Sequence, residues 1–157
     1  MPTSNVYLGL GTNLGNKEKN LMVAVEEIAS RIGKVISLSG FYTTDPWGFT
    51  SSNTFLNAAC IIETHRSPSE VLALAKQIET DMGRRQKSAN GIYSDRPIDI
   101  DILLYDDLVL QTPELTIPHP LMHQRLFVMQ PLAEIAGECI HPILHKTIRQ
   151  LCEAIHN

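Results

Sequence analysis

The stretch Arg96-Pro97-Ile98-Asp99-Ile100-Asp101-Ile102-Leu103-Leu104-Tyr105 decides the fold and indicates the chemistry. Branched apolar residues alternate with acids and then continue as an apolar run, which is typical of a β-strand. Because side chains alternate between the two faces of a strand, Asp99 and Asp101 should share one face, opposite to the neighbouring isoleucines.

Two carboxylates on one face repel each other, so a half-buried pair requires a proton, a basic neighbour or a cation. Mg²⁺ is commonly bound through one or two carboxylates together with substrate phosphates. The plain alternative is a solvent-facing strand whose acids add solubility. The Asp99/Asp101 pair by itself therefore leaves a metal site and a solvated face open.

Length and composition favour a single domain spanning 1–157, with 43% hydrophobic residues and a net charge of −4. The acidic balance argues against a general nucleic-acid binder. No apolar run approaches the ~20 residues that a membrane-spanning helix needs, and the N-terminus does not resemble a signal peptide. An odd number of cysteines without a CxxC motif fits a reducing cytosol, so we expect a cytoplasmic protein.

Periodicity and breaker residues predict strands over 6–10, 34–43, 54–63, 96–105 and 108–110, and helices over 17–32, 68–82, 121–136 and 147–155. Asn16 is expected to cap the first helix, and Ser67-Pro68-Ser69-Glu70 is a capping box with proline at the first helical position. Glycines 9, 11 and 15 miss the spacing of a nucleotide-binding loop, which favours a strand-to-helix turn. The element order predicts an α+β, ferredoxin-like sandwich, with helices mainly on one face of an antiparallel sheet plus C-terminal additions.

Phe55 and Asn57 lie two apart on the strand predicted over 54–63 and therefore share a face. An aromatic ring beside an amide could stack on a flat heterocycle and hydrogen-bond its edge. A core phenylalanine and a backbone-capping asparagine remain equally open. Trp47 and Phe49 fall in a segment rich in breakers, which favours a ligand-covering role.

The segment 83–96 carries four basic residues and one acid and leads directly into the acid pair. A local charge of about +3 beside two carboxylates suits a polyphosphate with its metal ions, although charged runs are often only solvated surface. Glu79 lies off the apolar stripe near a helix end, where the helix dipole disfavours an acid, so it is a functional candidate.

Two histidine pairs, His119/His123 and His141/His145, repeat an HPxxH spacing but lack the glutamate of a zinc metalloprotease. A zinc site is therefore not favoured. His119, held between two prolines, is a better candidate for a phosphate contact.

Five blocks, in order, resemble the 6-hydroxymethyl-7,8-dihydropterin pyrophosphokinase family across almost the whole chain. They are Tyr7-Leu8-Gly9-Leu10-Gly11-Thr12-Asn13-Leu14-Gly15, Tyr42-Thr43-Thr44-Asp45-Pro46-Trp47-Gly48, Phe55-Leu56-Asn57-Ala58, Arg96-Pro97-Ile98-Asp99-Ile100-Asp101-Ile102-Leu103, and Pro118-His119 with the segments 125–128 and 131–136. The block containing the two acids is the most specific.

The resemblance implies transfer of the β,γ-diphosphate of ATP to the hydroxymethyl group of a reduced pterin, with release of AMP, in folate biosynthesis. It implies that Asp99 and Asp101 hold two Mg²⁺ ions and that Arg84 and Arg96 lie on the triphosphate and assist the reaction. The other implied ATP contacts are Glu79, Ile102, His119 and Arg125, and the implied pterin contacts are Thr44, Pro46, Trp47, Phe55, Asn57 and Phe127.

The sequence departs from the family pattern in two places. Gln86 stands where a second loop arginine is common, which leaves Arg85 or Lys87 as the substitute, and Pro120 replaces an aromatic after His119. Tyr93 takes the place of a loop aromatic. Only small-molecule partners and a monomer are expected. A metal-dependent phosphohydrolase and a module binding single-stranded nucleic acid are the competing hypotheses.

Overall fold

The computed structural model describes residues 2–44, 54–84 and 97–155. Its elements in chain order are β1 (Ser4–Thr12), α1 (Lys17–Arg31), β2 (Lys34–Leu38), β3 (Tyr42–Thr44), β4 (Phe55–Thr64), α2 (Pro68–Glu79), a π-helical turn (Thr80–Arg84), β5 (Asp99–Tyr105), β6 (Leu110–Gln111), β7 (Thr116–Ile117), a 3-10 turn (Met122–Gln124), α3 (Leu126–Ala136) and α4 (Ile148–Glu153). No helix in these ranges is long and apolar enough to cross a membrane.

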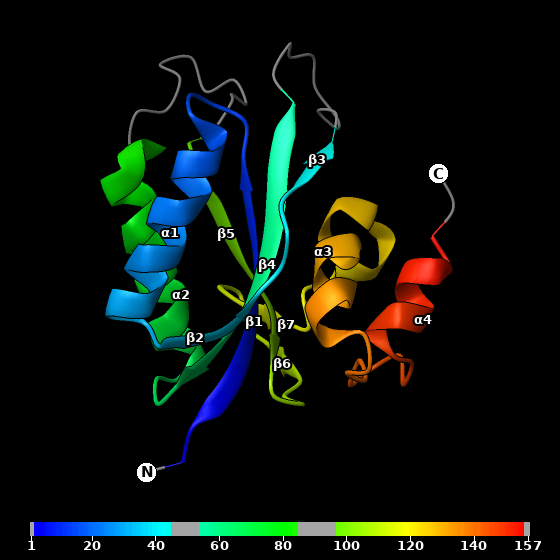
Figure 1. Cartoon of the computed structure of the whole chain (residues 1–157). Helices are drawn as coiled ribbons and strands as arrows, with labels where there is room; N and C mark the ends of the chain where they lie inside the picture. The colour runs from blue at the N-terminus through cyan, green and yellow to red at the C-terminus, as the bar shows by residue number, and fades with distance from the viewer. Residues whose placement is uncertain (1, 45–53, 85–96, 156–157) are drawn as a thin grey trace.

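Within the described ranges, the main sheet has five strands in the order β2-β4-β1-β5, with β3 pairing with β4 as well. All neighbouring strands are antiparallel. Figure 1 shows α1 and α2 on one side of this sheet and α3 and α4 on the other. The predicted α+β class is confirmed. The predicted C-terminal additions include α3 and α4, which cover the second face of the sheet.

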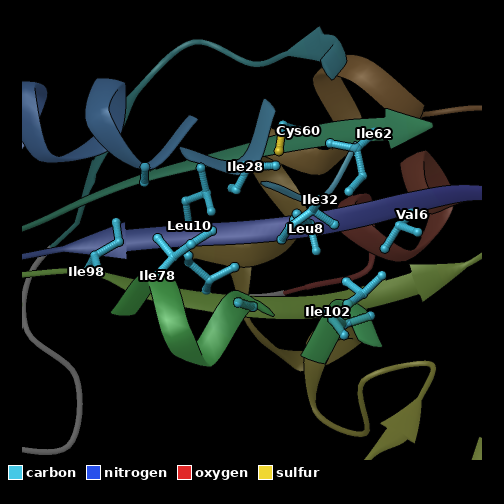
Figure 2. Packing of buried hydrophobic residues seen from close by; sticks show 14 of the residues in the cluster. Val6, Leu8, Leu10, Ile28, Ile32, Cys60, Ile62, Ile78, Ile98 and Ile102 are labelled. Atoms are coloured by element: carbon cyan, nitrogen blue, oxygen red, sulfur yellow. The ribbon is translucent and has the colours of Figure 1, made fainter. Parts of the chain in front are cut away.

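The face under α1 and α2 carries a continuous apolar core (Figure 2). Ile98, Ile100 and Ile102 are at most 6% exposed there, and they pack with residues of the neighbouring strands such as Leu8 and Leu10. Cys60 lies in the same core, and burial raises the pKa of its thiol to about 12. The isoleucines that alternate with the acids are therefore core residues, as predicted.

The predicted starts of the first two helices are confirmed by their hydrogen bonds. The Asn16 side chain accepts from the backbone N–H of Lys19 at 3.1 Å. Ser67 and Glu70 form the reciprocal pair of a capping box, and Pro68 is the first residue of α2. These contacts satisfy N–H groups that have no partner inside the helix.

Two predicted elements are interrupted. The strand expected over 34–43 divides into β2 and β3, because Ser39 turns its hydroxyl toward β4 and accepts from the N–H of Ala59 at 2.9 Å. The helix expected over 121–136 is broken at Arg125, whose backbone is extended (φ −116°, ψ 106°) between the 3-10 turn and α3. The last helix ends at Glu153 rather than at 155, and the edge strand expected over 108–110 is β6, shifted toward Gln111.

β5 contains an irregularity that the sequence pattern does not indicate. Leu8 pairs with Ile102 and Tyr7 pairs with Leu104, so Leu103 is passed over in the register. Such a bulge lets consecutive residues face the same side. Leu103 and Leu104 are accordingly both buried in the second core, under α3 and α4.

Candidate active site

The register of the three central strands places the acid pair opposite an amide. Across β4, β1 and β5, Asn57 lies opposite Gly11 and Gly11 opposite Asp99, while Gly9 separates Ala59 from Asp101. Directly opposed residues of antiparallel strands project on the same face. Asn57 and the two acids therefore project on the face away from the α1/α2 core, on either side of Gly9 and Gly11 of β1. These two residues form a strip without side chains on that face, here called the glycine strip.

Asn57 depends on this glycine strip for its position. A Cβ at Gly11 would lie 3.0 Å from Asn57 Oδ1 and 3.9 Å from a ring carbon of Phe55, whereas a Cβ at Gly9 would meet only Leu103, at 3.4 Å or more. The Asn57 side chain thus lies over Gly11 and is only 5% exposed. Phe55 and Asn57 share this face, as predicted.

Glu79 is brought to the acid-bearing strand by the end of α2. It is 5% exposed, and its Oε2 accepts a 2.7 Å hydrogen bond from the backbone N–H of Ile100, the residue between the two aspartates. The N–H of Ile100 therefore points away from β1, and in an antiparallel ladder the backbone of Ile102 faces the same edge of β5. The Ile102 side chain itself lies in the α1/α2 core, so only its backbone can contact a ligand at this edge.

His119 follows the cis peptide bond between Ile117 and Pro118, and its N–H donates to the carbonyl of the bulged Leu103 at 3.0 Å. Burial and the positive charge of Arg125 lower the pKa of His119, and the negative charge of Asp99 opposes them. The imidazole is therefore neutral near pH 7. Because Nδ1 accepts from the N–H of Leu121 at 3.3 Å, the ring proton lies on Nε2, where it can be donated to a ligand oxygen.

Arg125 and Phe127 lie together because the chain is extended at Arg125. The guanidinium carbon lies 5.8 Å from the centroid of the Phe127 ring, within the range of a cation–π contact. The positive charge of Arg125 also lowers the pKa of His119. The 3-10 turn and the start of α3 thus bring three predicted ligand contacts to one segment.

The predicted residues divide into three groups. Asp99, Asp101, Asn57, Phe55, Glu79, His119, Arg125 and Phe127 are all described, and the contacts above link them around β1 and β5. Pro46, Trp47, Phe49, Tyr93, Arg96 and the segment from Arg85 to Lys87 lie outside the described residues. Thr44 ends β3 opposite Phe55 and Arg84 ends the π-helical turn, but only their backbones are described.

The donor set fits Mg²⁺ that arrives with phosphates. Within residues 2–44, 54–84 and 97–155, no three His, Cys, Asp or Glu residues gather as a complete metal site. Asp99 and Asp101 supply two carboxylates on one face of one strand, and Mg²⁺ takes its remaining ligands from water and phosphate oxygens. The pair is therefore suited to a metal–nucleotide complex rather than to a closed structural site.

Sequence reasoning missed three features of the site: the bulge at Leu103, the cis bond before Pro118, and a contact from Glu134 of α3 to β3. The role of Gly9 and Gly11 could have been inferred from the sequence. The two glycines recur at the same two-residue period as the two acids, which is the pattern expected where neighbouring strands place side chains over a third strand.

Comparison with known proteins identifies the family. The model of the 7,8-dihydro-6-hydroxymethylpterin-pyrophosphokinase family (HPPK) matches residues 7–137. The chain belongs to the HPPK family. A 2-amino-4-hydroxy-6-hydroxymethyldihydropteridine pyrophosphokinase of Porphyromonas gingivalis is 47% identical over 138 residues, covering 87% of this chain and 93% of that protein. The similarly named HPPK protein of Aquifex aeolicus is 37% identical over 147 residues, covering 94% and 89%.

Solved structures of HPPK-DHPS chains share the fold. One, in complex with substrates, superposes with a TM-score of 0.78 at 17% identity, covering 98% of this chain and 43% of the solved chain. Another, of Plasmodium falciparum with pteroate, gives 0.77 at 18% identity, covering 96% and 42%. This chain therefore spans less than half the length of those HPPK-DHPS chains.

Proposed function

We propose that this chain transfers the β,γ-diphosphate of ATP to the hydroxymethyl group of 6-hydroxymethyl-7,8-dihydropterin and releases AMP, as a step of folate biosynthesis. The observation that carries the proposal is the row Asn57–Gly11–Asp99, which sets an amide and an acid pair across a side-chain-free strip in a chain of the HPPK family.

The pterin is assigned to the Asn57 side of this strip. Asn57 offers one carbonyl oxygen and one NH₂ group, which match a heterocycle edge carrying both donors and acceptors. Phe55 lies beside Asn57, and Phe127 at the start of α3 is the proposed second stacking ring. Thr44, Pro46 and Trp47 complete the proposed pterin contacts.

The triphosphate is assigned to the acid side. Asp99 and Asp101 would hold two Mg²⁺ ions, which when bound neutralise phosphate charge and polarise the β-phosphorus. The neutral His119 would donate from Nε2 to a phosphate oxygen, and Arg125, Arg84 and Arg96 would add positive charge. Glu79 and the backbone of Ile102, at the outer edge of β5, are the remaining proposed ATP contacts.

The reaction needs positioning more than a strong base. The hydroxymethyl oxygen attacks the β-phosphorus, the bond from that phosphorus to the α,β-bridging oxygen breaks, AMP leaves, and the hydroxyl proton passes to solvent. Phosphoryl transfer has a loose transition state, so alignment and charge neutralisation supply most of the rate. The arrangement of the acids on a strand whose other face is core suits this requirement.

When the short β3 is left aside, the order is β1-α1-β2-β4-α2-β5, with β2-β4-β1-β5 across the sheet. This order is the basis for proposing a ferredoxin-like sandwich. We also propose that the protein acts as a cytoplasmic monomer on small molecules alone.

The deciding experiment incubates the protein with ATP, Mg²⁺ and 6-hydroxymethyl-7,8-dihydropterin and separates the nucleotides. AMP that forms only when both pterin and Mg²⁺ are present is the expected result. ADP or free phosphate without pterin would indicate a phosphohydrolase instead. Absence of any turnover would favour a binding module and would overturn the proposal.

A further inference from the structure

Glu134 of α3 forms hydrogen bonds to the segment of Gly40 and β3, which lies on the other side of the candidate site. Its carboxylate accepts from the backbone N–H of Gly40, at 3.0 Å to one oxygen and 3.2 Å to the other, and from the Tyr42 hydroxyl at 2.6 Å. The short O–H···O contact is that expected of a charge-assisted hydrogen bond. This bond also raises the pKa of Tyr42. Glu134 itself is exposed, so core packing does not account for these contacts.

Tyr42 connects this contact to Asn57. The two residues are directly paired between β3 and β4, and the Asn57 amide lies 3.5 Å from the Tyr42 carbonyl oxygen as a long hydrogen bond. On its other side Asn57 lies over Gly11. A movement of β3 would therefore move the backbone group against which the Asn57 amide is oriented.

Glu134 also joins two parts of the pterin site that different elements supply. α3 carries Glu134 and, in its first turn, Phe127, while β3 and β4 carry Tyr42, Phe55 and Asn57. β3 is a strand of three residues, and among the described strands its sheet pairing is to β4. A short edge strand of this kind needs an additional contact to stay in place.

We propose that Glu134 is a positioning residue for pterin recognition: through Gly40 and Tyr42 it fixes β3, and thereby the orientation of Asn57, relative to the helix that carries Phe127. This inference rests on the proposed function. It assigns Glu134 no contact with either substrate, so its effect should fall on the pterin and not on ATP.

The test measures steady-state KM for the pterin and for ATP, kcat, and thermal unfolding in four variants. Glu134→Ala should raise the pterin KM about tenfold, because a charge-assisted hydrogen bond is lost, and should change the ATP KM by less than about twofold. Tyr42→Phe, which keeps the Gly40 contact, should raise the pterin KM about threefold. Glu134→Gln should restore values within about twofold of wild type, because Oε1 alone can accept from both donors.

Gln130→Ala is the matched control, because Gln130 is an exposed residue of the same helix. It should change neither KM. A Glu134→Ala protein with an unchanged pterin KM, with both KM values raised equally, or without rescue by glutamine would overturn the inference. If Glu134→Ala does not fold, an unchanged pterin KM in Tyr42→Phe would overturn it.

Failure of this inference is distinguishable from failure of the proposed function. Wild-type protein that forms no pterin-dependent AMP would overturn the function and this inference with it. Wild-type turnover together with unchanged pterin KM values in the variants would overturn only the role of Glu134.

Discussion

The two faces of the sheet formed by β1, β4 and β5 differ in their chemical character. Toward α1 and α2, β1, β4 and β5 present a continuous set of buried apolar side chains, including Leu8, Ile62 and Ile100. Toward α3 and α4, the same strands present glycine, asparagine and aspartate together with Phe55 at one end, and the apolar residues of the second core, such as Ile61 and Leu103, farther along. One face forms a core and the other carries the polar residues of the proposed site, although neighbouring residues in the sequence alternate between them.

The strongest way to test this division is to remove an acid. Asp99→Ala or Asp101→Ala should reduce pterin-dependent AMP formation by more than about a thousandfold, because metal coordination contributes several kcal/mol to transition-state stabilisation. Thermal unfolding should be little changed, since neither side chain lies in the core.

Asp107→Ala is the control for these acids, because Asp107 is exposed in the turn that follows β5. Near-normal rates in the Asp99 and Asp101 variants, or an equal loss in Asp107→Ala, would remove the proposed metal role.

A substitution on the face toward α1 and α2 should lower stability rather than turnover. Leu8 is fully buried beside Gly9, and Leu8→Ala should lower the free energy of unfolding by about 3 kcal/mol, through lost burial and the cavity left behind. Urea unfolding measures this loss, and turnover per folded molecule should stay close to that of wild type. Ile36→Ala, at a position 46% exposed on β2, should cost far less. A selective loss of turnover in Leu8→Ala would contradict the division between the faces.

Alanine substitutions at the two positions of the glycine strip should reduce activity to different extents. In Gly11→Ala the new methyl group would lie 3.0 Å from Asn57 Oδ1, so we expect pterin kcat/KM to fall about tenfold as Asn57 is displaced. In Gly9→Ala the nearest atom would be an ordinary 3.4 Å away on Leu103, so the loss should be smaller. Steady-state kinetics with varied pterin measures both. Equal losses in the two variants would show that Asn57 does not depend on Gly11.

The smallest effect is expected from His141, on the α3/α4 side. Its buried Nδ1 accepts from the N–H groups of Ile143 and Leu144, at 3.2 and 3.1 Å, and burial followed by the charges of His123 and His145 lowers its pKa. The unfolded chain therefore takes up this proton first as pH falls below about 6.5. Stability should be unaffected above that pH and should decrease below it, down to the folded-state pKa.

Urea unfolding between pH 7 and pH 5 measures this decrease. His141→Asn, whose Oδ1 can accept the same N–H groups without titrating, should flatten the dependence on pH. His119, whose pKa is also lowered, contributes with the same sign in every variant that keeps it. An unaltered slope in His141→Asn would exclude this role.

Local patterns of the sequence were sufficient for the features that depend on alternation and capping. The faces of Asp99, Asp101, Phe55 and Asn57, and the starts of α1 and α2, follow from two-residue periodicity and from side chains that bond nearby N–H groups. The α+β class follows from the order of these elements. Each of these depends on residues close together in the chain.

The features that were not predicted depend on contacts between distant residues. The break at Ser39 requires Ala59, the bulge at Leu103 places its carbonyl against the N–H of His119, and Glu134 meets Gly40 and Tyr42 from 92 or more positions away. No local propensity encodes these pairings, since they form only when the layers pack.

The alternation of acids with buried isoleucines makes β5 particularly sensitive to changes in length. Insertion or deletion of one residue between Asp99 and Ile102 would exchange the faces of the strand, turning carboxylates toward Leu8 and Leu10 and isoleucines toward Asn57. Such a change would disrupt both the core and the proposed ligand-binding surface. We therefore expect homologous chains to vary in length at the turn of Asp106 and Asp107, and to keep a constant number of residues within this strand.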